Sequence, residues 1–420
     1  MLNNWVKISL LNFQSTNVVR FINATLAYLV TAVALFVIFQ WLRYQVPAAV
    51  LQDILSFFFI SAVASGIEPG TAKAYLLMQN TNVGKSNIGL LSLLLVSTIK
   101  AFLASPFFAV VWFLTNSGDA SNFWYIAWTP ILIIIGFITT DLRVIIDAGE
   151  RYTHAVWLKQ GSLSLGMLVL ASAYMAGMSL DIAIGAALLS RLLWLMAFLL
   201  MEHHHFGRTA TSIIEPLVSV EQRRWLDLAL TSVLAAISGS IDRILVFMYL
   251  PAAEASSFFI ISELLTKFWL LPYVLGPIVF AKWATGADGS SFTRGAHVII
   301  VTAGVTFVTI VAFAVYLYPH YIRIILGEAF DVYGIVLFSM AIVIVSTSQI
   351  YLAELQGRGR AKQVVNVFLF ITILSVPLFY FCIQVFSLQG LYSAWVIKAT
   401  IECAFLYYIV TRTMHYEPSR

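Results

Sequence analysis

Long apolar stretches dominate the sequence, and short polar or basic turns separate each stretch from the next. A helix needs about 20 consecutive apolar residues to cross the roughly 30 Å of hydrocarbon in a bilayer. By this criterion the sequence predicts twelve membrane-spanning helices, at residues 20–42, 51–78, 87–114, 124–145, 156–177, 182–201, 226–250, 256–281, 296–318, 331–353, 364–386 and 390–411. The connecting loops are short, so the pattern leaves no room for a soluble domain.

The longest loop, residues 202–225, divides these helices into six and six. We therefore predict an all-α integral membrane protein, with twelve transmembrane helices in two pseudo-symmetric six-helix bundles around a central cavity. Residues 1–201 form the N-terminal half, 202–225 a cytoplasmic linker and 226–420 the C-terminal half. Composition agrees with this class, because only 10% of the residues are charged whereas soluble proteins average about 25%.

Basic residues lie mainly on one side of the predicted spans, as the positive-inside rule requires. With the N-terminus in the cytoplasm, only Arg43 and Arg323 fall on the opposite side. The sequence therefore predicts that both termini are cytoplasmic. The basic residues of the cytoplasmic tails and loops are Lys7, Arg20, Lys85, Arg143, Arg151, Lys159, Arg208, Arg223, Arg224, Lys282, Arg294, Arg358, Arg360, Lys362, Arg412 and Arg420.

The two halves resemble each other near their last helices. The stretch SLDIAIGAALLSR (179–191) corresponds to SLQGLYSAWVIK (387–398), with one residue of slippage. Each places a basic residue, Arg191 or Lys398, inside the last helix of its half. Parallel six-helix repeats occur in many transporters, whose binding sites lie between the repeats near the bilayer midplane.

Charged residues remain inside the predicted spans, where each costs roughly 2.5–3.5 kcal/mol on insertion scales. The acidic ones deep inside the spans are Glu68, Asp242, Glu263 and Glu402, with Asp141 nearer a helix end. The basic ones are Lys73, Lys100, Arg191, Arg243, Lys267 and Lys398. Charges at this depth mark either structural pairs between helices or a substrate path.

Spacing separates these charges into two groups. Glu263 and Lys267 are four residues apart and share one helix face, and Lys398 and Glu402 repeat that spacing. For each pair, a self-neutralised salt bridge and a place in a cavity both stay open. Lys100, Arg191 and Arg243 have no acidic residue four away. We therefore predict a hydrated cavity that receives an anion.

Other chemistry has weaker signals. The triplet 203–205 is all histidine but lies at a predicted cytoplasmic helix end, where polar residues are ordinary. No phosphate-binding loop, zinc-protease motif or nucleophile elbow is present in the sequence. We therefore expect neither an enzyme nor an ATP-driven pump, and no catalytic residue, metal or cofactor.

Several stretches resemble a known family. SGSIDRILVFMYLPAAEASSFFIISELLTKFWLLP (238–272) is similar to the seventh and eighth helices of polysaccharide flippases in the multidrug/oligosaccharidyl-lipid/polysaccharide (MOP) exporter superfamily. LGEAFDVYGIVLF (326–338), AELQGRGRAK (353–362) and GLYSAWVIK (390–398) resemble the entry to helix ten, the turn after it and the start of the last helix. Length and topology resemble the O-antigen (Wzx-type) branch, although Pro251-Ala252-Ala253 replaces the usual Leu-Gly turn.

This resemblance implies a flippase that moves an undecaprenyl-diphosphate-linked oligosaccharide from the cytoplasmic to the periplasmic leaflet of the bacterial inner membrane. Its partners would be the lipid-linked oligosaccharide, membrane lipid and, in the pathway, a polysaccharide polymerase and glycosyltransferases. We expect Arg191, Arg243, Lys100 and Lys398 to face the cavity and hold the diphosphate or acidic sugars. Lys267 and Lys73 are second choices, because Glu263 or Glu68 can neutralise each one locally.

Asp242, Glu68 and Glu263 are candidates for carrying protons or Na⁺. Asp242 and Arg243 diverge by about 100° on a helix, so we expect Arg243 to face the cavity and Asp242 to bind a neighbouring base or the coupling ion. A multidrug or metabolite cation-coupled antiporter of the same superfamily is the nearest alternative. A membrane polymerase or ligase is another, but the predicted outer loops are short for such chemistry.

Overall fold

A computed structural model describes residues 15–67, 90–115, 123–148, 151–202, 222–284, 289–326 and 332–416, and these residues form helices without any strand. The predicted all-α class is thereby confirmed for this part of the chain. The helices are α2 (Ser15–Gln45), α3 (Ala48–Ala64), α5 (Leu90–Thr115), α6 (Phe123–Ala148), α7 (Tyr152–Val156), the π-helix η2 (Trp157–Gly161), α8 (Ser162–Met175), α9 (Leu180–Glu202), α11 (Gln222–Ser238), α12 (Ile241–Tyr249), α13 (Ala252–Leu265), the 3₁₀-helix η4 (Thr266–Trp269), α14 (Leu270–Ala284), α15 (Ser290–Leu317), α16 (Pro319–Leu326), α17 (Val332–Gly357) and α18 (Ala361–Tyr416).

Nine helices in the described ranges are long and apolar enough to cross a membrane, and Ala48–Ala64 is a shorter apolar helix. The last of the nine runs over Ala361–Arg412 and covers two of the spans that the sequence predicts. Within it, Ser387 has φ 52° and ψ −137°, so the helical backbone breaks there and two helices meet at a kink. The structure therefore supports a multi-pass membrane protein, and the count of twelve stays a prediction.

The chain separates into two compact units. Unit 1 comprises Met1–Leu26 and Ile261–Arg420, and unit 2 comprises Ala27–Ile260. The predicted linker, 202–225, lies largely outside the described residues. The division into two six-helix halves accordingly stays a prediction, and each unit is described by itself.

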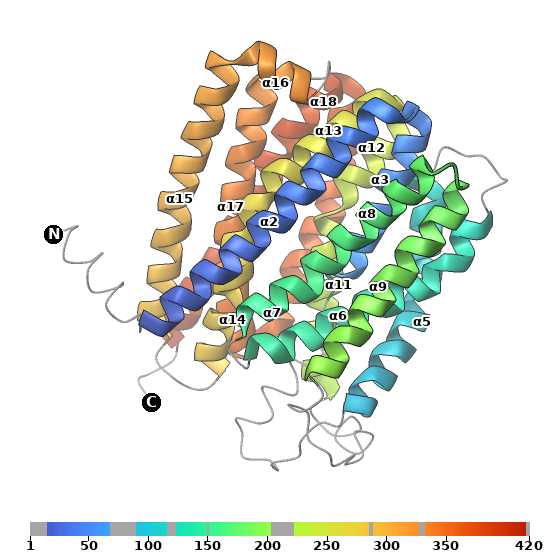
Figure 1. Cartoon of the computed structure of the whole chain (residues 1–420). Helices are drawn as coiled ribbons and strands as arrows, with labels where there is room; N and C mark the ends of the chain where they lie inside the picture. The colour runs from blue at the N-terminus through green and yellow to red at the C-terminus, as the bar shows by residue number, and fades with distance from the viewer. Residues whose placement is uncertain are drawn as a thin grey trace. The chain divides into compact units, whose positions relative to one another are not determined.

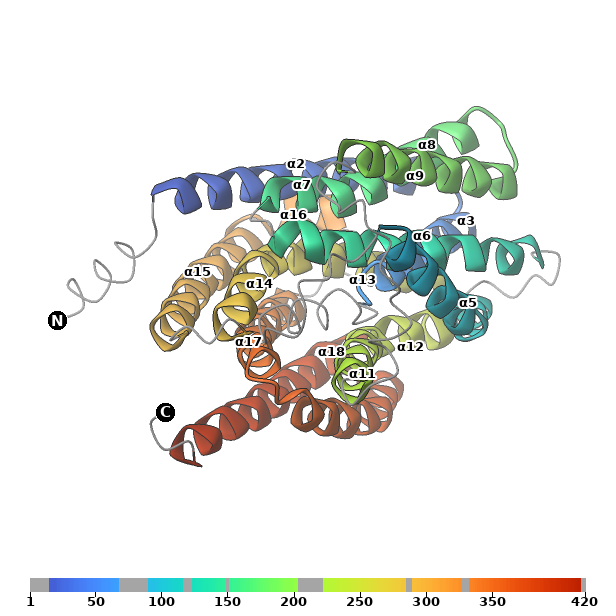
Figure 2. The same ribbon diagram turned by 90° about the horizontal axis from the view of Figure 1, so that it is seen from below.

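Unit 2 is built on antiparallel helix pairs. Helices α8 and α9 pack along each other and lie side by side in both ribbon views, and α5 packs on α6 (Figures 1 and 2). Gly136 lets α6 approach α3 closely, because a Cβ added there would lie 2.8 Å from the carbonyl carbon of Ala64. Bulkier residues at this crossing would force the two backbones apart.

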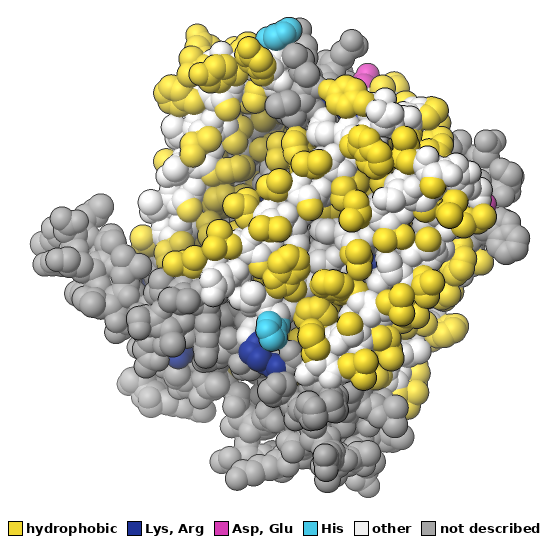
Figure 3. Space-filling model, viewed as in Figure 1, with side chains coloured by type: hydrophobic (Ala, Val, Ile, Leu, Met, Phe, Trp, Pro, Cys, Tyr) yellow, Lys and Arg dark blue, Asp and Glu magenta, His cyan; other side chains and the backbone are white. Residues whose placement is uncertain are grey.

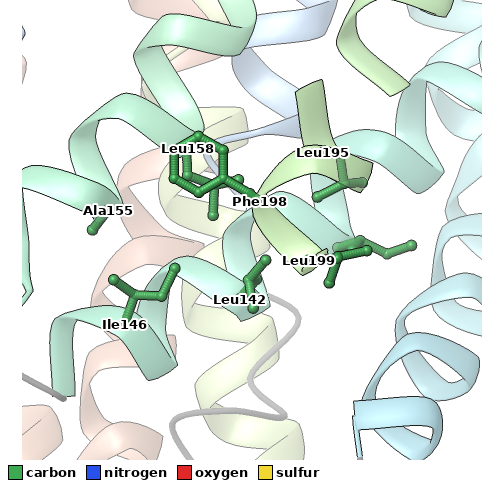
Figure 4. Packing of buried hydrophobic residues seen from close by; sticks show 8 residues of the cluster. Leu142, Ile146, Ala155, Leu158, Leu195, Phe198 and Leu199 are labelled. Atoms are coloured by element: carbon green, nitrogen blue, oxygen red, sulfur yellow. The ribbon is translucent and has the colours of Figure 1, made fainter. Parts of the chain in front are cut away.

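A buried apolar cluster joins α6, α7, η2 and α9 within unit 2 (Figure 4). Leucine and phenylalanine side chains from α9 meet apolar side chains of the other three elements. The cluster consists of Ile138, Leu142, Ile146, Ala155, Leu158, Leu195, Phe198 and Leu199. It fixes the rotation of α9 about its own axis and thereby decides which α9 residues face inward.

Unit 1 centres on α17, which packs against α14, α15 and α18. The α15–α17 crossing is close, because a Cβ added to Gly304 would overlap the side chain of Val343. The ribbon in Figure 1 shows α15 and α17 running alongside each other.

The outward faces of the helices are apolar. In α9, Leu189, Leu193 and Leu200 are exposed, and in α15 Val305 and Ile310 are exposed. Figure 3 shows hydrophobic side chains spread across the visible face, with few charged ones among them. Apolar surface of this extent is disfavoured in water but suits contact with lipid.

Candidate functional site

The structure describes seven of the nine predicted site residues; Glu68 and Lys73 lie outside the described residues. Unit 2 contains Lys100, Arg191, Asp242 and Arg243, whereas unit 1 contains Glu263, Lys267 and Lys398. The predicted roles of these residues in substrate or ion binding stay predictions. Their surroundings, however, differ sharply.

Arg191 is buried by the periodicity of α9. Exposed leucines at 189, 193 and 200 mark the outward face of this helix, and Arg191 lies between Leu188 and Leu195 on the inward face. Its side chain is 1% exposed.

Two serine hydroxyls hold the Arg191 guanidinium. Its Nε donates to Ser162 Oγ over 3.3 Å, and its Nη2 donates to Ser65 Oγ over 3.2 Å. The remaining nitrogen, Nη1, is buried without a hydrogen-bond partner among the described residues. Within those residues the structure shows no carboxylate paired with Arg191. The described hydrogen-bond partners of this buried guanidinium are therefore both neutral.

Two glycines, Gly161 and Gly166, allow close packing around Arg191. Gly166 faces the arginine stem, because a Cβ added there would lie 2.8 Å from Arg191 Cδ. Gly161, the last residue of the π-helix, faces the ring of Trp194 at 2.9 Å in the same construction. Trp194 Nε1 donates to the carbonyl oxygen of Trp157 over 3.1 Å. π-Turns inside α-helices occur frequently at functional sites, and this one sets the position of Ser162.

Arg243 in α12 has aromatic surroundings. Its Cζ lies 5.9 Å from the ring centroid of Phe59 and 5.8 Å from that of Phe259, within the range of a cation–π interaction. The side chain is 8% exposed, so it does not face lipid. Asp242, its neighbour in sequence, is completely buried.

The rings around Arg243 form a cluster that connects four helices of unit 2. Phe259 of α13 lies 5.9 Å from Phe247 of α12 and 6.0 Å from Phe58 of α3. Phe58 in turn lies 5.0 Å from Phe39 of α2. All of these phenylalanines are buried. Arg243 therefore lies against a buried aromatic cluster of unit 2.

Lys100 has an acidic neighbour on another helix. Asp141 of α6 exerts a favourable electrostatic interaction on Lys100, and Ser97 Oγ donates to Asp141 Oδ2 over 2.5 Å. The sequence shows no partner four residues away, and the structure supplies one from a different element. Lys100 is half-buried, whereas Arg191 is fully buried.

Lys398 of unit 1 is buried in a more complete network. Its ammonium lies 4.4 Å from the ring centroid of Trp395 and interacts electrostatically with Glu402. Ser348 Oγ of α17 donates to Glu402 Oε1 over 2.7 Å. Lys398 is 2% exposed, yet its charge is balanced on its own helix.

The predicted proximity of Glu263 and Lys267 is confirmed. Lys267 Nζ lies 3.0 Å from Glu263 Oε2, and both side chains are partly exposed. Of the two alternatives for this pair, the local salt bridge is present, which makes Lys267 a weaker anion-binding candidate than Arg191.

Some buried polar residues are not evident as site candidates from sequence. Ser65 and Ser162 contact Arg191 although they lie far from it in the chain. Asp53 of α3 and Arg143 of α6 are buried charges, at 8% and 6% exposure. Asp53 could have been found from the sequence as a charge inside an apolar stretch. Single serines in membrane helices, in contrast, are too common to indicate a site.

The described helices share the fold of solved MATE transporter structures. Solved structures similar to this chain include an outward-facing multidrug resistance MATE family transporter of the MOP superfamily, with 15% identity, a TM-score of 0.67, and coverage of 94% of this chain and 95% of that one. A eukaryotic MATE transporter has 14% identity and a TM-score of 0.67, with 94% and 96% covered.

A third similar structure is a MOP superfamily transporter from Pyrococcus furiosus, described as having a binding pocket of reverse polarity that suggests a different function. It has 15% identity and a TM-score of 0.68, with coverage of 95% of this chain and 96% of that one. At these identities the likeness shows the fold. No protein-family profile matches the chain, and no curated protein matches it.

Proposed function

We propose that this protein is a flippase that carries an undecaprenyl-diphosphate-linked oligosaccharide from the cytoplasmic to the periplasmic leaflet of a bacterial inner membrane by alternating access. The observation that carries the proposal is the burial of three cations, Arg191, Arg243 and Lys398, in otherwise apolar helices. An exporter of cationic drugs would favour an acidic interior instead.

The chemistry of the proposed substrate matches these cations. A diphosphate cannot enter hydrocarbon without partners, and guanidinium groups bind phosphate oxygens through directed, charge-assisted hydrogen bonds. Arg243 adds an aromatic surface, since Phe59 and Phe259 lie beneath it. The polyprenyl chain would remain in lipid while the protein shelters the polar head.

The similar structures support transport as the activity, because they are transporters and cover nearly the whole chain. The printed description of the Pyrococcus furiosus protein also indicates that this fold accommodates pockets of different polarity. Transport of a bulky anionic head group by this architecture is therefore compatible with its relatives.

A cation-coupled multidrug or metabolite antiporter is the second candidate. It is favoured by the multidrug transporters among the similar structures and by the buried carboxylates Asp141, Asp242 and Glu402. In either case we propose that Asp242, Glu263 and Glu68 are the first residues to examine for proton or Na⁺ coupling.

Transport in proteoliposomes tests the choice. The purified full chain should move a fluorescent undecaprenyl-diphosphate oligosaccharide between leaflets and leave a cationic dye untransported. Movement of the dye alone would contradict the flippase. Collapsing the proton and sodium gradients separately would then identify any coupling ion. Glycosyltransferase and polymerase genes beside the coding gene would also support the flippase.

The variants Arg191→Ala and Arg243→Ala should lose transport at normal membrane abundance. Arg294→Gln is a suitable control, because Arg294 is exposed and the substitution removes one positive charge from the surface. Transport that persists in both alanine variants would contradict the assignment of these residues.

A further inference from the structure

The two arms of α18, before and after the break at Ser387, pack against each other as an antiparallel hairpin within unit 1. The ring centroids of Phe370 and Phe405 lie 5.4 Å apart, and those of Phe379 and Trp395 lie 5.8 Å apart. Moving forward from the first contact to the second on one arm means moving back on the other. The start of the first arm and the end of the second arm therefore lie at the same end of the hairpin.

Each arm has an exposed row of residues that changes from apolar to polar and then to basic toward this end. The first arm has a phenylalanine, an asparagine and a lysine four residues apart, and the second has a phenylalanine, a tyrosine and an arginine at positions i, i+3 and i+7. Such spacings keep residues on one side of a helix. The six residues, all exposed, are called the hairpin face: Phe370, Asn366 and Lys362 of the first arm, and Phe405, Tyr408 and Arg412 of the second.

The hairpin face has the dimensions of one phospholipid leaflet. Lys362 precedes Phe370 by eight residues, which corresponds to about 12 Å along a helix, and the hydrocarbon of one leaflet is roughly 15 Å thick, half of the bilayer core. With the cations at the head groups, the phenylalanines lie at the depth of the acyl chains. The amide and phenol between them then lie at the interface, where tyrosine is enriched in membrane proteins.

The turn before the first arm fixes where that arm begins. Gly359 has φ 73°, and the N–H of Arg360 donates to the carbonyl oxygen of Leu355 over 2.8 Å, which is the pattern of a glycine-based helix cap. Arg358 lies 3.8 Å from the ring centroid of Trp283. The cap and the stacked arginine hold the start of α18 on α17 and α14, so Lys362 has a fixed place at the end of the hairpin.

We propose that the hairpin face binds one anionic glycerophospholipid of the predicted cytoplasmic leaflet. The lysine and arginine contact its phosphate, the asparagine amide and tyrosine hydroxyl donate to its ester carbonyl oxygens, and its acyl chains cover the two phenylalanines. Basic residues between helices on the cytoplasmic side are a recognised basis for binding anionic head groups. This site goes beyond the proposed function, because it holds a lipid of the surrounding bilayer and not the lipid that is carried.

The first experiment titrates the purified full chain in detergent with phosphatidylglycerol and with phosphatidylcholine of the same acyl chains, and counts bound lipids by native mass spectrometry. We expect the first phosphatidylglycerol to bind at least about tenfold more tightly than phosphatidylcholine, since each basic residue near a head group contributes about fivefold. Lys362→Gln combined with Arg412→Gln should bring the two lipids to nearly equal affinity. A preference retained in this double variant would overturn the proposal.

Two further variants separate a specific site from general surface charge. Arg294→Gln removes an exposed cation from the start of α15 and should keep the native preference, whereas a loss as large as that of the double variant would overturn the site. Lys362→Arg keeps the charge and should bind within about twofold of the native protein, because charge attraction to the head group is retained. The melting temperature of every variant in phosphatidylcholine should match the native value, which excludes unfolding as the cause of lost binding.

The position and the source of the lipid are tested directly. A phosphatidylglycerol with a photoreactive group in its acyl chain should label peptides that contain Phe370 or Phe405, and labelling of other peptides alone would overturn the site. Undecaprenyl phosphate is the competing source of a phosphate head group. If it displaces phosphatidylglycerol at lower concentration than unlabelled phosphatidylglycerol does, the hairpin face belongs to the substrate path and the proposal is wrong. Neither result depends on whether the protein flips a lipid-linked oligosaccharide.

Discussion

Arg191 in unit 2 and Lys398 in unit 1 end corresponding stretches of the predicted repeat, and both are almost fully buried. Lys398 interacts with Glu402, one turn further along the same helix, and with the ring of Trp395. In the described part of the chain, the hydrogen-bond partners of the Arg191 side chain are two serine hydroxyls. The two positions therefore differ: a carboxylate on the same helix interacts with Lys398, whereas the described hydrogen-bond partners of Arg191 are neutral.

The largest expected difference concerns transport. Replacing Arg191 by alanine should lower substrate affinity by about 2–5 kcal/mol, or roughly 30-fold or more, because it removes a buried charged donor. Lys398→Ala should affect transport less, since Glu402 already engages that charge. Binding of the labelled lipid-linked substrate to both variants in detergent checks this, and equal losses would remove the distinction between the two sites.

Removing the carboxylate that interacts with Lys398 should lower the stability of the fold. Glu402→Gln leaves the Lys398 ammonium buried without its carboxylate, and breaking a buried pair in this way costs about 3–5 kcal/mol. The double variant Lys398→Met with Glu402→Gln should recover most of that loss. Chemical unfolding in detergent measures both. An equally unstable double variant would mean that Glu402 acts through Ser348 rather than through Lys398.

A smaller effect is expected from steric pressure on Arg191. Gly166→Ala places a Cβ 2.8 Å from Arg191 Cδ, and overpacking of this kind costs typically about 1–3 kcal/mol. Chemical unfolding of the purified chain in detergent measures this loss of stability. Gly276→Ala is the matched control, because its Cβ would meet only the Ala353 Cβ at 3.9 Å. Similar behaviour of the two variants would show that Arg191 adjusts freely.

The smallest effect should come from the aromatic contact of Lys398. Trp395→Phe reduces a cation–π interaction worth about 0.5–1 kcal/mol at accessible sites and more when desolvated. Its packing against Phe338 and Phe379, at 5.6 and 5.8 Å between centroids, would be largely kept. The free energy of unfolding should fall by about 1 kcal/mol with transport unchanged. A transport defect would instead place Trp395 on the substrate path.

Local spacing predicted the parts of this arrangement that lie on one helix. The pair Glu263–Lys267 follows from the i,i+4 rule and is present, and the deep positions of Arg191, Arg243 and Lys398 follow from the lengths of the apolar stretches. Contacts between elements that are distant in the chain could not be predicted from this spacing. Nothing in the sequence around Lys100 identifies Asp141 as its neighbour, because helix packing decides that pairing.

Irregularities of the helical backbone could not be predicted from the sequence either. The residues WLKQG (157–161) carry no proline that would announce a departure from the α-helix, yet they form a π-turn. The aromatic cluster around Arg243 shows the same limit, since its rings come from four helices. Periodicity predicts which face of a helix is buried, and it does not predict the partner that covers that face.

The π-turn at Trp157–Gly161 makes the contact between Ser162 and Arg191 depend on the length of the chain. A π-turn contains one more residue than the α-turn it replaces, so deleting one residue there would rotate all of α8 by about 100° relative to α7. Ser162 would then turn away from Arg191, and Gly166 would no longer lie beneath the arginine stem. A homologue one residue shorter at this point is therefore expected to carry a neutral residue in place of Arg191, so that an insertion or deletion and a charge change would be inherited together.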